Sequence, residues 1–137
     1  MSFIRYKGKT KLVYAPVTPS TAITAGALVT FSSGKLIAAT SSTAAVDIFG
    51  VIRHTIASTD SDYASDRLVE VEVPVDRHTQ WTCDVTSGLV TTDVGLEVDL
   101  TDSLNVNRTA NSVKVVKALR RLSATKGIFM VKFNGSY

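Results

Sequence analysis

The sequence predicts a small all-β fold: a single β-barrel, β-tulip or sandwich-like domain with an extended N-terminal arm. Valine, isoleucine and threonine together account for 42 of the 137 residues, whereas glutamate, glutamine and methionine occur three times, once and twice. β-Branched residues favour strands, and the scarce residues are those that usually fill helix surfaces. The eight glycines are dispersed along the chain, close to the expected turns. A chain of this length supports one modest hydrophobic core.

Residues 1–22 are expected to form an extended arm ahead of the barrel domain, residues 23–137. Three lysines lie among the first eleven residues, and Pro16 and Pro19 restrict the backbone to extended conformations. The alternative for this stretch is a first edge strand followed by a loop within the domain.

Short strands separated by turns are expected after the arm. Residues 27–31 (ALVTF) and 35–40 (KLIAAT) are separated by Ser-Ser-Gly, which is the pattern of a β-hairpin. A polar loop then leads to the apolar segment 46–56 (VDIFGVIRHTI). Within that segment, Gly50 indicates either a β-bulge or a close approach of two backbones.

Residues 67–76 show the clearest alternation in the chain. The valines at odd positions are expected to face the core, and Glu70, Glu72 and Pro74 to face solvent. One buried face and one solvated face are typical of an antiparallel sheet or a small barrel. The valines concerned are Val69, Val71, Val73 and Val75.

Further strands are expected at residues 79–85, where Trp81 should lie in the core, and at 95–100. Residues 113–123 fit both a helical stripe and a strand. The valine run favours the strand, with residues 127–133 as its hairpin partner. The expected total is about eight or nine strands at a spacing of about ten residues, which is typical of sandwiches and barrels.

Charge is segregated along the chain. Residues 1–46 hold five basic residues and no acid, and residues 108–137 hold seven basic residues and no acid. Residues 47–107 hold all twelve acids and three arginines. Such segregation indicates complementary surfaces. Either the basic ends neutralise the acidic middle within one subunit, or the charges meet across subunits or on a larger partner.

We expect neither an enzyme nor a cofactor. The thiol of Cys83 could meet His54 or His78 only through the fold, and the sequence contains no local nucleophile motif and no phosphate-binding glycine motif. With one cysteine the chain cannot form an internal disulfide, and it does not have the ligands of a structural zinc site. No stretch approaches the roughly 18 apolar residues of a membrane-spanning helix.

The loop that follows the apolar segment 46–56 has carboxylates at Asp60, Asp62 and Asp66. Alternating oxygen ligands suit a hard cation, but the glycine and the closing glutamate of a calcium loop are missing. A solvated turn is therefore expected, with a weak surface ion site as the alternative, and no metal is assigned.

The segment 23–51, ITAGALVTFSSGKLIAATSSTAAVDIFGV, resembles the core of the head decoration proteins (cement or head-stabilising proteins) of tailed bacteriophages. Three later segments follow in the order found in that family. They are Val-Glu-Val-Pro-Val at 71–75, Asp-Val-Gly-Leu-Glu-Val-Asp-Leu at 93–100 and the terminal strand 127–133.

The resemblance implies a structural protein that binds the outer surface of an icosahedral phage capsid and stabilises it. Homotrimers would lie at three-fold or quasi-three-fold positions, with the major capsid protein as partner and no small-molecule substrate. Assembly would take place in the host bacterial cytoplasm and the product would lie on the virion exterior. In that family an N-terminal arm often reaches the capsid, which implies a binding role here for Arg5, Lys7, Lys9, Lys11 and Tyr14.

Two other classes stay open. One is a phage tail or baseplate structural protein, or a receptor-binding barrel on the virion surface. The other is a nucleic-acid-binding barrel, in which the basic arm and Lys117, Arg120 and Arg121 would follow a phosphate backbone. The acidic centre of the expected sheet argues against nucleic acid as the partner.

Overall fold

The computed structural model describes residues 3–76, 78–86 and 88–133. These residues form eleven strands and two short 3-10 helices, which confirms the all-β class. The elements are β1 (Ile4–Lys7), β2 (Thr10–Val17), β3 (Leu28–Ser32), β4 (Lys35–Ala38), η1 (Ala45–Asp47), β5 (Ile48–Ile52), β6 (Arg67–Pro74), β7 (Gln80–Thr86), η2 (Thr91–Asp93), β8 (Glu97–Leu100), β9 (Asn105–Asn107), β10 (Val116–Ser123) and β11 (Lys126–Val131).

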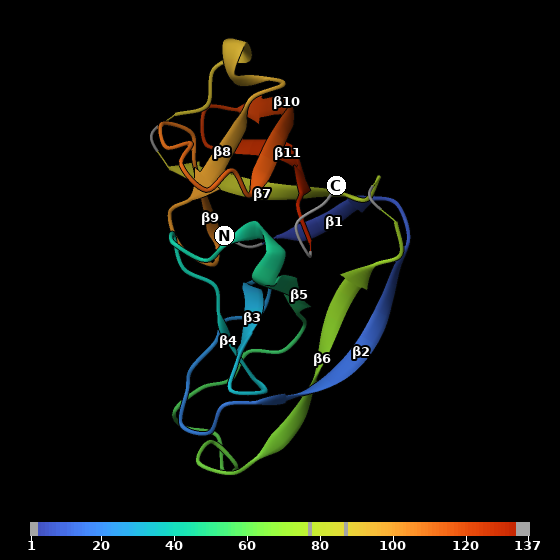
Figure 1. Cartoon of the computed structure of the whole chain (residues 1–137), viewed down its shortest axis with the longest axis vertical. Helices are drawn as coiled ribbons and strands as arrows, with labels where there is room; N and C mark the ends of the chain where they lie inside the picture. Colours follow the sequence, from blue (N-terminus) through green and yellow to red (C-terminus); the bar gives the residue numbers. More distant parts are fainter. Residues whose placement is uncertain (1–2, 77, 87, 134–137) are drawn as a thin grey trace.

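The strands form two sheets stacked along the long axis of the molecule (Figure 1). Strands β2-β4-β3-β5-β6 close into one barrel, here called the N-terminal barrel. The other sheet has the order β1-β7-β11-β10-β8-β9, and an additional pairing of β7 with β9 closes its last five strands into a ring, here called the C-terminal barrel. The single barrel expected for residues 23–137 is therefore corrected to two, because the chain supplies a complete set of strands twice.

The two barrels share one topology, with β2 to β6 corresponding in order to β7 to β11. In each barrel the first strand pairs parallel with the third and antiparallel with the fifth. The second strand pairs with the third and fourth, and the fourth pairs with the fifth. The fold is thus an internal structural repeat, which the sequence analysis did not detect.

Individual hydrogen bonds repeat as well. In each barrel, a left-handed glycine and the residue after it exchange backbone hydrogen bonds of 2.7–3.1 Å with one residue of the fourth strand. The glycines are Gly26, with φ of 89°, and Gly95, with φ of 91°. The residues involved are Gly26, Ala27 and Ile52 in one barrel and Gly95, Leu96 and Ala118 in the other. The repeat lies in backbone pairing, and equivalent side chains mostly differ.

The larger hydrophobic core consists mainly of residues of the C-terminal barrel and extends to the N-terminal barrel. Trp81 and Phe129 of the C-terminal barrel pack there with Leu28 and Ile48 of the N-terminal barrel. Trp81 is fully buried, as expected. Phe3, which precedes β1, is 2% exposed and is part of the same core. A second cluster fills the interior of the N-terminal barrel.

The expected separate arm is corrected by the structure. Strand β1 pairs with β7, and β2 pairs with β6 along its whole length, so both belong to the sheets. The turn at Gly8, with φ of 102°, sends the chain from one barrel to the other. Burial of Phe3 and two rows of backbone hydrogen bonds explain why this basic stretch does not extend into solvent.

Several local predictions are confirmed. Strands β3 and β4 form the expected hairpin, and residues 113–123 contain a strand, β10, paired with β11. The register between β3 and β5 shifts beside Gly50, where an added Cβ would lie 2.6 Å from Val71 Cγ1. Gly50 is therefore both a bulge and a close approach.

Two expectations for residues 67–76 are wrong. Val75 lies just beyond the end of β6 and is 57% exposed. Glu72, expected in solvent, is only 5% exposed, because side chains from β1, β2 and the end of β5 cover it. The alternation places Glu72 on the outer face of the N-terminal barrel, as predicted, but tertiary packing buries that part of the face.

Candidate interaction surface

The five residues implied in capsid binding fall into two groups. Lys7, Lys9 and Lys11 are exposed along β1, the Gly8 turn and the start of β2, and they make no ion pair within the described part of the chain. Arg5 and Tyr14 instead bind carboxylates of β6. The structure therefore brings the three lysines into one exposed stretch and gives Arg5 and Tyr14 intrachain partners.

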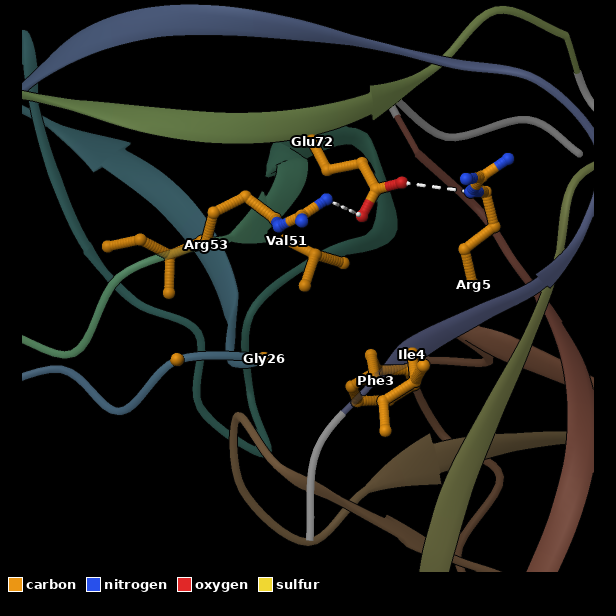
Figure 2. A pocket seen from close by; sticks show the side chains of 9 residues that line it. Phe3, Ile4, Arg5, Gly26, Val51, Arg53 and Glu72 are labelled. Atoms are coloured by element: carbon orange, nitrogen blue, oxygen red, sulfur yellow. Dashed lines mark hydrogen bonds and ion pairs between the residues drawn. The ribbon is translucent and has the colours of Figure 1, made fainter.

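Arg5 belongs to a four-residue cluster around Glu72, and Figure 2 shows Arg5, Arg53 and Glu72 of this cluster. Glu72 Oε2 lies 3.1 Å from Arg5 Nε and accepts a 2.6 Å hydrogen bond from Thr10 Oγ1. Glu72 Oε1 lies 3.1 Å from Arg53 Nη1. The cluster borders a cleft of about 350 Å³ between the two sheets. Phe3, Gly26 and Val51 are among the other residues that line this cleft. Glu72 thus links β1 of one sheet with strands of the other.

A second group of contacts surrounds Glu70. Tyr14 Oη donates a 2.8 Å hydrogen bond to Glu70 Oε1, and His54 Nε2 lies 3.7 Å from Glu70 Oε2. The hydrogen bond to Glu70 and the charge of that carboxylate raise the pKa of the Tyr14 hydroxyl above 10.0. The Tyr14 ring is nevertheless 63% exposed, so this contact orients the side chain without burying it.

Apolar side chains are exposed beside Tyr14 on the outer face of β2 and β6. Leu12 is 52% exposed and Leu68 is 64% exposed. In the antiparallel register, Leu12 lies opposite Glu72 and Tyr14 opposite Glu70. We call Leu12, Tyr14 and Leu68 the β2–β6 surface. It is an apolar stripe with Lys9 and Lys11 near one end.

Part of the segregated charge is neutralised within one chain. Five ion pairs join a basic end segment to the acidic middle: Arg5–Glu72, Lys35–Asp66, Arg108–Asp93, Lys126–Asp84 and Lys132–Glu97. For these residues, the basic ends thus neutralise the acidic middle within one subunit, which was the first of the two alternatives. The lysines near the Gly8 turn are the part of the basic N-terminal segment that is left for other contacts.

The aspartates of the loop 60–66 are also paired. Arg67 forms ion pairs with Asp60 and Asp62, and Lys35 Nζ lies 2.5 Å from Asp66 Oδ1. No cluster of three or more histidine, cysteine or carboxylate side chains suited to a metal is found among the described residues. The loop is a salt-bridged turn, which gives the Asp60, Asp62 and Asp66 carboxylates cationic partners from the chain itself.

The structure does not bring Cys83 and the histidines together in any described contact. The Cys83 thiol is buried in the larger hydrophobic core and donates to the Leu104 carbonyl at 3.1 Å. Burial raises the pKa of that thiol far above its usual range. The His54 side chain is 59% exposed on the N-terminal barrel. A thiol held neutral in a core is a poor nucleophile.

Sequence reasoning missed the partnership of Arg53 with Glu72, and no local pattern signals it. Arg53 follows an apolar strand and Glu72 lies in an alternating one, and only the pairing of β5 with β6 makes them neighbours.

No protein-family model matches this sequence, and the comparison with curated proteins finds no match. Within the described ranges, none of the helices is of a length and apolarity that would let it cross a membrane.

Proposed function

We propose that this chain is a structural virion protein that binds the outer surface of an icosahedral phage capsid and stabilises it as a decoration protein, in homotrimers at three-fold or quasi-three-fold positions. The resemblance of residues 23–51, 71–75 and 93–100 to decoration proteins suggests the class. The observation that carries the proposal is the β2–β6 surface, an exposed apolar stripe near lysines that have no ion pair with any described residue.

This surface has the physical properties that adhesion to a shell requires. It lies on a strand pair held by eight residue pairs, and the Glu72 cluster ties that strand pair to the other barrel. A rigid surface loses little conformational freedom on binding. Burying a large apolar side chain contributes roughly 1.5–3 kcal/mol, and three linked copies multiply the effect of modest single contacts. Lys9 and Lys11 would favour an acidic region of the shell.

Co-sedimentation tests the proposal. Purified protein is titrated onto expanded capsids of the virus that encodes the chain, and saturable binding is expected. The double variant Leu12→Ser/Tyr14→Ser should bind at least about tenfold more weakly, since each lost apolar contact is worth more than 1 kcal/mol. The control, Val46→Ser, alters a residue that is 64% exposed on η1, away from the β2–β6 surface, and should bind as the wild type does.

Two results would count against the proposal: no binding of the wild-type chain to expanded capsids, or equal binding of the double variant. Light scattering on the free protein adds the oligomeric state. A mass of three times 14.7 kDa supports a trimer, whereas a larger ring favours the tail or baseplate class.

A specific groove favours nucleic-acid binding as a second candidate. Tyr6, Lys7, Leu119 and Arg120 line a hollow of about 670 Å³ on the C-terminal barrel, together with Gln80 and Ile128. An aromatic ring beside two cations can stack a base and contact phosphates. Binding of single-stranded DNA that weakens steeply with salt, and that is lost in Tyr6→Ala/Arg120→Ala, would favour this candidate.

A further inference from the structure

One side of strand β2 has free backbone groups. Thr18 N donates to Leu36 O of β4, whereas Lys9 O accepts from Val75 N beyond β6. Backbone N–H and C=O groups alternate in direction along a strand. In β2, those of even-numbered residues therefore point to the β4 side and those of odd-numbered residues point to β6. Strand β4 meets β2 only at Val17. Within the described chain, the N–H and C=O groups of Leu12 and Tyr14 therefore have no hydrogen-bond partner.

The internal repeat shows what can occupy such an edge. The parallel pair Val17–Leu36 of the N-terminal barrel corresponds to Val85–Val106 of the C-terminal barrel. Counting back along β2 and β7, residues 12–14 correspond to residues 80–82. Residues 80–82 are covered by β1, which pairs antiparallel with them. The same edge is filled in one barrel and bare in the other.

We propose that the bare edge of β2 binds one short extended segment of a partner protein, antiparallel to β2 and opposite residues 11–15, in the manner in which β1 lies on β7. Exposed strand edges are general templates for strand addition. The segment forms hydrogen bonds with the backbone of Leu12 and Tyr14. Identifying the partner as the capsid shell protein rests on the proposed function, whereas the bare edge itself does not.

Side chains next to the edge specify the chemistry of this segment. On the outer face its residues meet Leu12 and Tyr14, so apolar residues fit there. On the other face, Lys11 is exposed near one end of the edge, without an ion pair in the described residues, whereas Val13 is half-buried and Ala15 is buried. A carboxylate fits beside Lys11, and small apolar residues fit opposite Val13 and Ala15. The segment is therefore largely apolar, with an acidic residue at the end beside Lys11.

A second copy of the chain fits the edge poorly. If β2 of another copy paired antiparallel about Val13, its Lys9 would lie opposite Val17, the position that β4 already occupies. Strand β1 of another copy carries Arg5 and Lys7, which would bring like charges close to Lys9 and Lys11. A segment that leaves the edge after a few residues, as the chain does at Phe3, avoids the clash with β4.

Amide hydrogen exchange of the ¹⁵N-labelled full chain tests the free edge directly. We expect fast exchange at Leu12 and Tyr14 and slow exchange at Val13 and Ala15, which pair with β6. The probe is the peptide Ac-Ala-Val-Ala-Val-Asp-NH2, whose valines lie opposite Leu12 and Tyr14 and whose aspartate lies opposite Lys11. At saturation it should slow the Leu12 and Tyr14 amides at least about tenfold. Its lysine counterpart, Ac-Ala-Val-Ala-Val-Lys-NH2, should not.

Three outcomes of these measurements overturn the proposal. The acidic peptide could leave both amides unprotected. The lysine peptide could protect them equally. The free protein could already protect them, either as a single chain or at twice the chain mass, in which case the edge is filled by this chain or by a second copy.

Measurements of capsid binding distinguish a failure of the edge proposal from a failure of the proposed function. Leu12→Pro removes a backbone N–H from the bare edge, on the same side of β2 as the nitrogen of Pro16, so the pairing with β6 is kept. Leu12→Thr keeps this N–H and loses a similar apolar contact. Leu12→Pro should bind capsids at least about tenfold more weakly than Leu12→Thr, because backbone hydrogen bonds to the segment are lost. Equal binding of the two variants overturns the edge proposal and leaves capsid decoration standing.

The converse result is equally distinct: peptide protection without capsid binding by the wild type overturns capsid decoration and leaves the edge proposal standing. If Leu12→Pro does not fold, Lys11→Glu replaces it in both assays. Lys11→Glu should abolish the preference for the acidic peptide, whereas the matched control Lys114→Glu, which alters an exposed lysine of the C-terminal barrel, should retain it.

Discussion

The Arg5 guanidinium of β1 lies 3.1 Å from the Glu72 carboxylate of β6, and this ion pair joins the two sheets. The Glu72 side chain is 6% exposed, and Arg53 binds its second oxygen. One carboxylate therefore balances two arginines that belong to different sheets. The relative placement of the barrels depends on that charge as well as on the apolar core beneath it.

Replacing Glu72 should destabilise the fold measurably. In Glu72→Gln both arginines lose their counter-charge, so we expect the free energy of unfolding to fall by about 2 kcal/mol, less than the roughly 3–5 kcal/mol of a fully buried pair because the arginines are half-exposed. Urea unfolding measures the change. The control Asp66→Asn removes an exposed pair with Lys35 and should cost about 0.5 kcal/mol or less. Equal losses in the two variants would contradict a structural role for the Glu72 cluster.

The turn at Gly8 should not tolerate a side chain. A Cβ at Gly8 would lie 2.7 Å from the Thr79 backbone, in addition to the strain of a φ of 102°. Gly34 also has a positive φ, 81°, but a Cβ there meets nothing within 4 Å. Gly34→Ala should therefore cost about 1 kcal/mol from strain alone, and Gly8→Ala clearly more. Thermal unfolding of both variants checks the order, and a Gly8→Ala protein as stable as Gly34→Ala would be inconsistent with this packing.

Stability should decrease in acid through two carboxyls of the C-terminal barrel. Hydrogen bonds from Arg108 hold the pKa of Asp93 below 3.8. Burial alone would raise the pKa of Asp99, but hydrogen bonds from Ser112, Val113 and Lys114 outweigh burial and keep it below 3.8. A carboxyl with a lower pKa in the folded chain stabilises the fold above its unfolded pKa, and this stabilisation is lost as pH falls through the folded pKa.

Urea unfolding between pH 7 and pH 2.5 measures this effect. The wild type should lose stability below about pH 4, and Asp93→Asn/Asp99→Asn should be less stable at pH 7 with a flatter profile at low pH. A double variant whose pH profile runs parallel to that of the wild type would show that other groups control the acid response.

The hydrogen bond between Tyr14 and Glu70 should be visible by spectroscopy. Glu70 raises the pKa of the Tyr14 hydroxyl above 10.0, so one tyrosine should ionise later than a free phenol in an ultraviolet titration. Tyr14→Phe should remove that late phase, and Glu70→Gln should move it towards 10.0 because the neutral amide no longer repels the phenolate. A late phase that persists in Tyr14→Phe would assign it to another tyrosine.

Sequence patterns predicted most of the strands correctly. The hairpin of β3 and β4 follows from two apolar runs around Ser-Ser-Gly, and β10 follows from the valine run in residues 113–123. These features are local, since β-branching and alternation act over a few residues. The prediction of a separate N-terminal arm was wrong, because a basic, proline-containing stretch can be extended either in solvent or within a sheet. The residues of the stretch itself do not distinguish these two environments.

The candidate site was only partly predictable. The three lysines and Tyr14 were found to be exposed, but the role of Glu72 and the bare edge of β2 depend on which strands become neighbours. Arg53 and Glu72 are nineteen positions apart and become neighbours only when β5 pairs with β6.

The sequence by itself determined that this protein is all-β, roughly where most strands lie, and that its acids and bases are segregated, because composition and alternation are properties of short segments. Only the tertiary structure decided that the strands close into two barrels of one topology, that β1 covers the edge of β7 while the edge of β2 stays bare, and that Glu72 is buried between two arginines. These outcomes come from long-range strand pairing, in which many registers satisfy the same local pattern and the packing of the whole chain selects one.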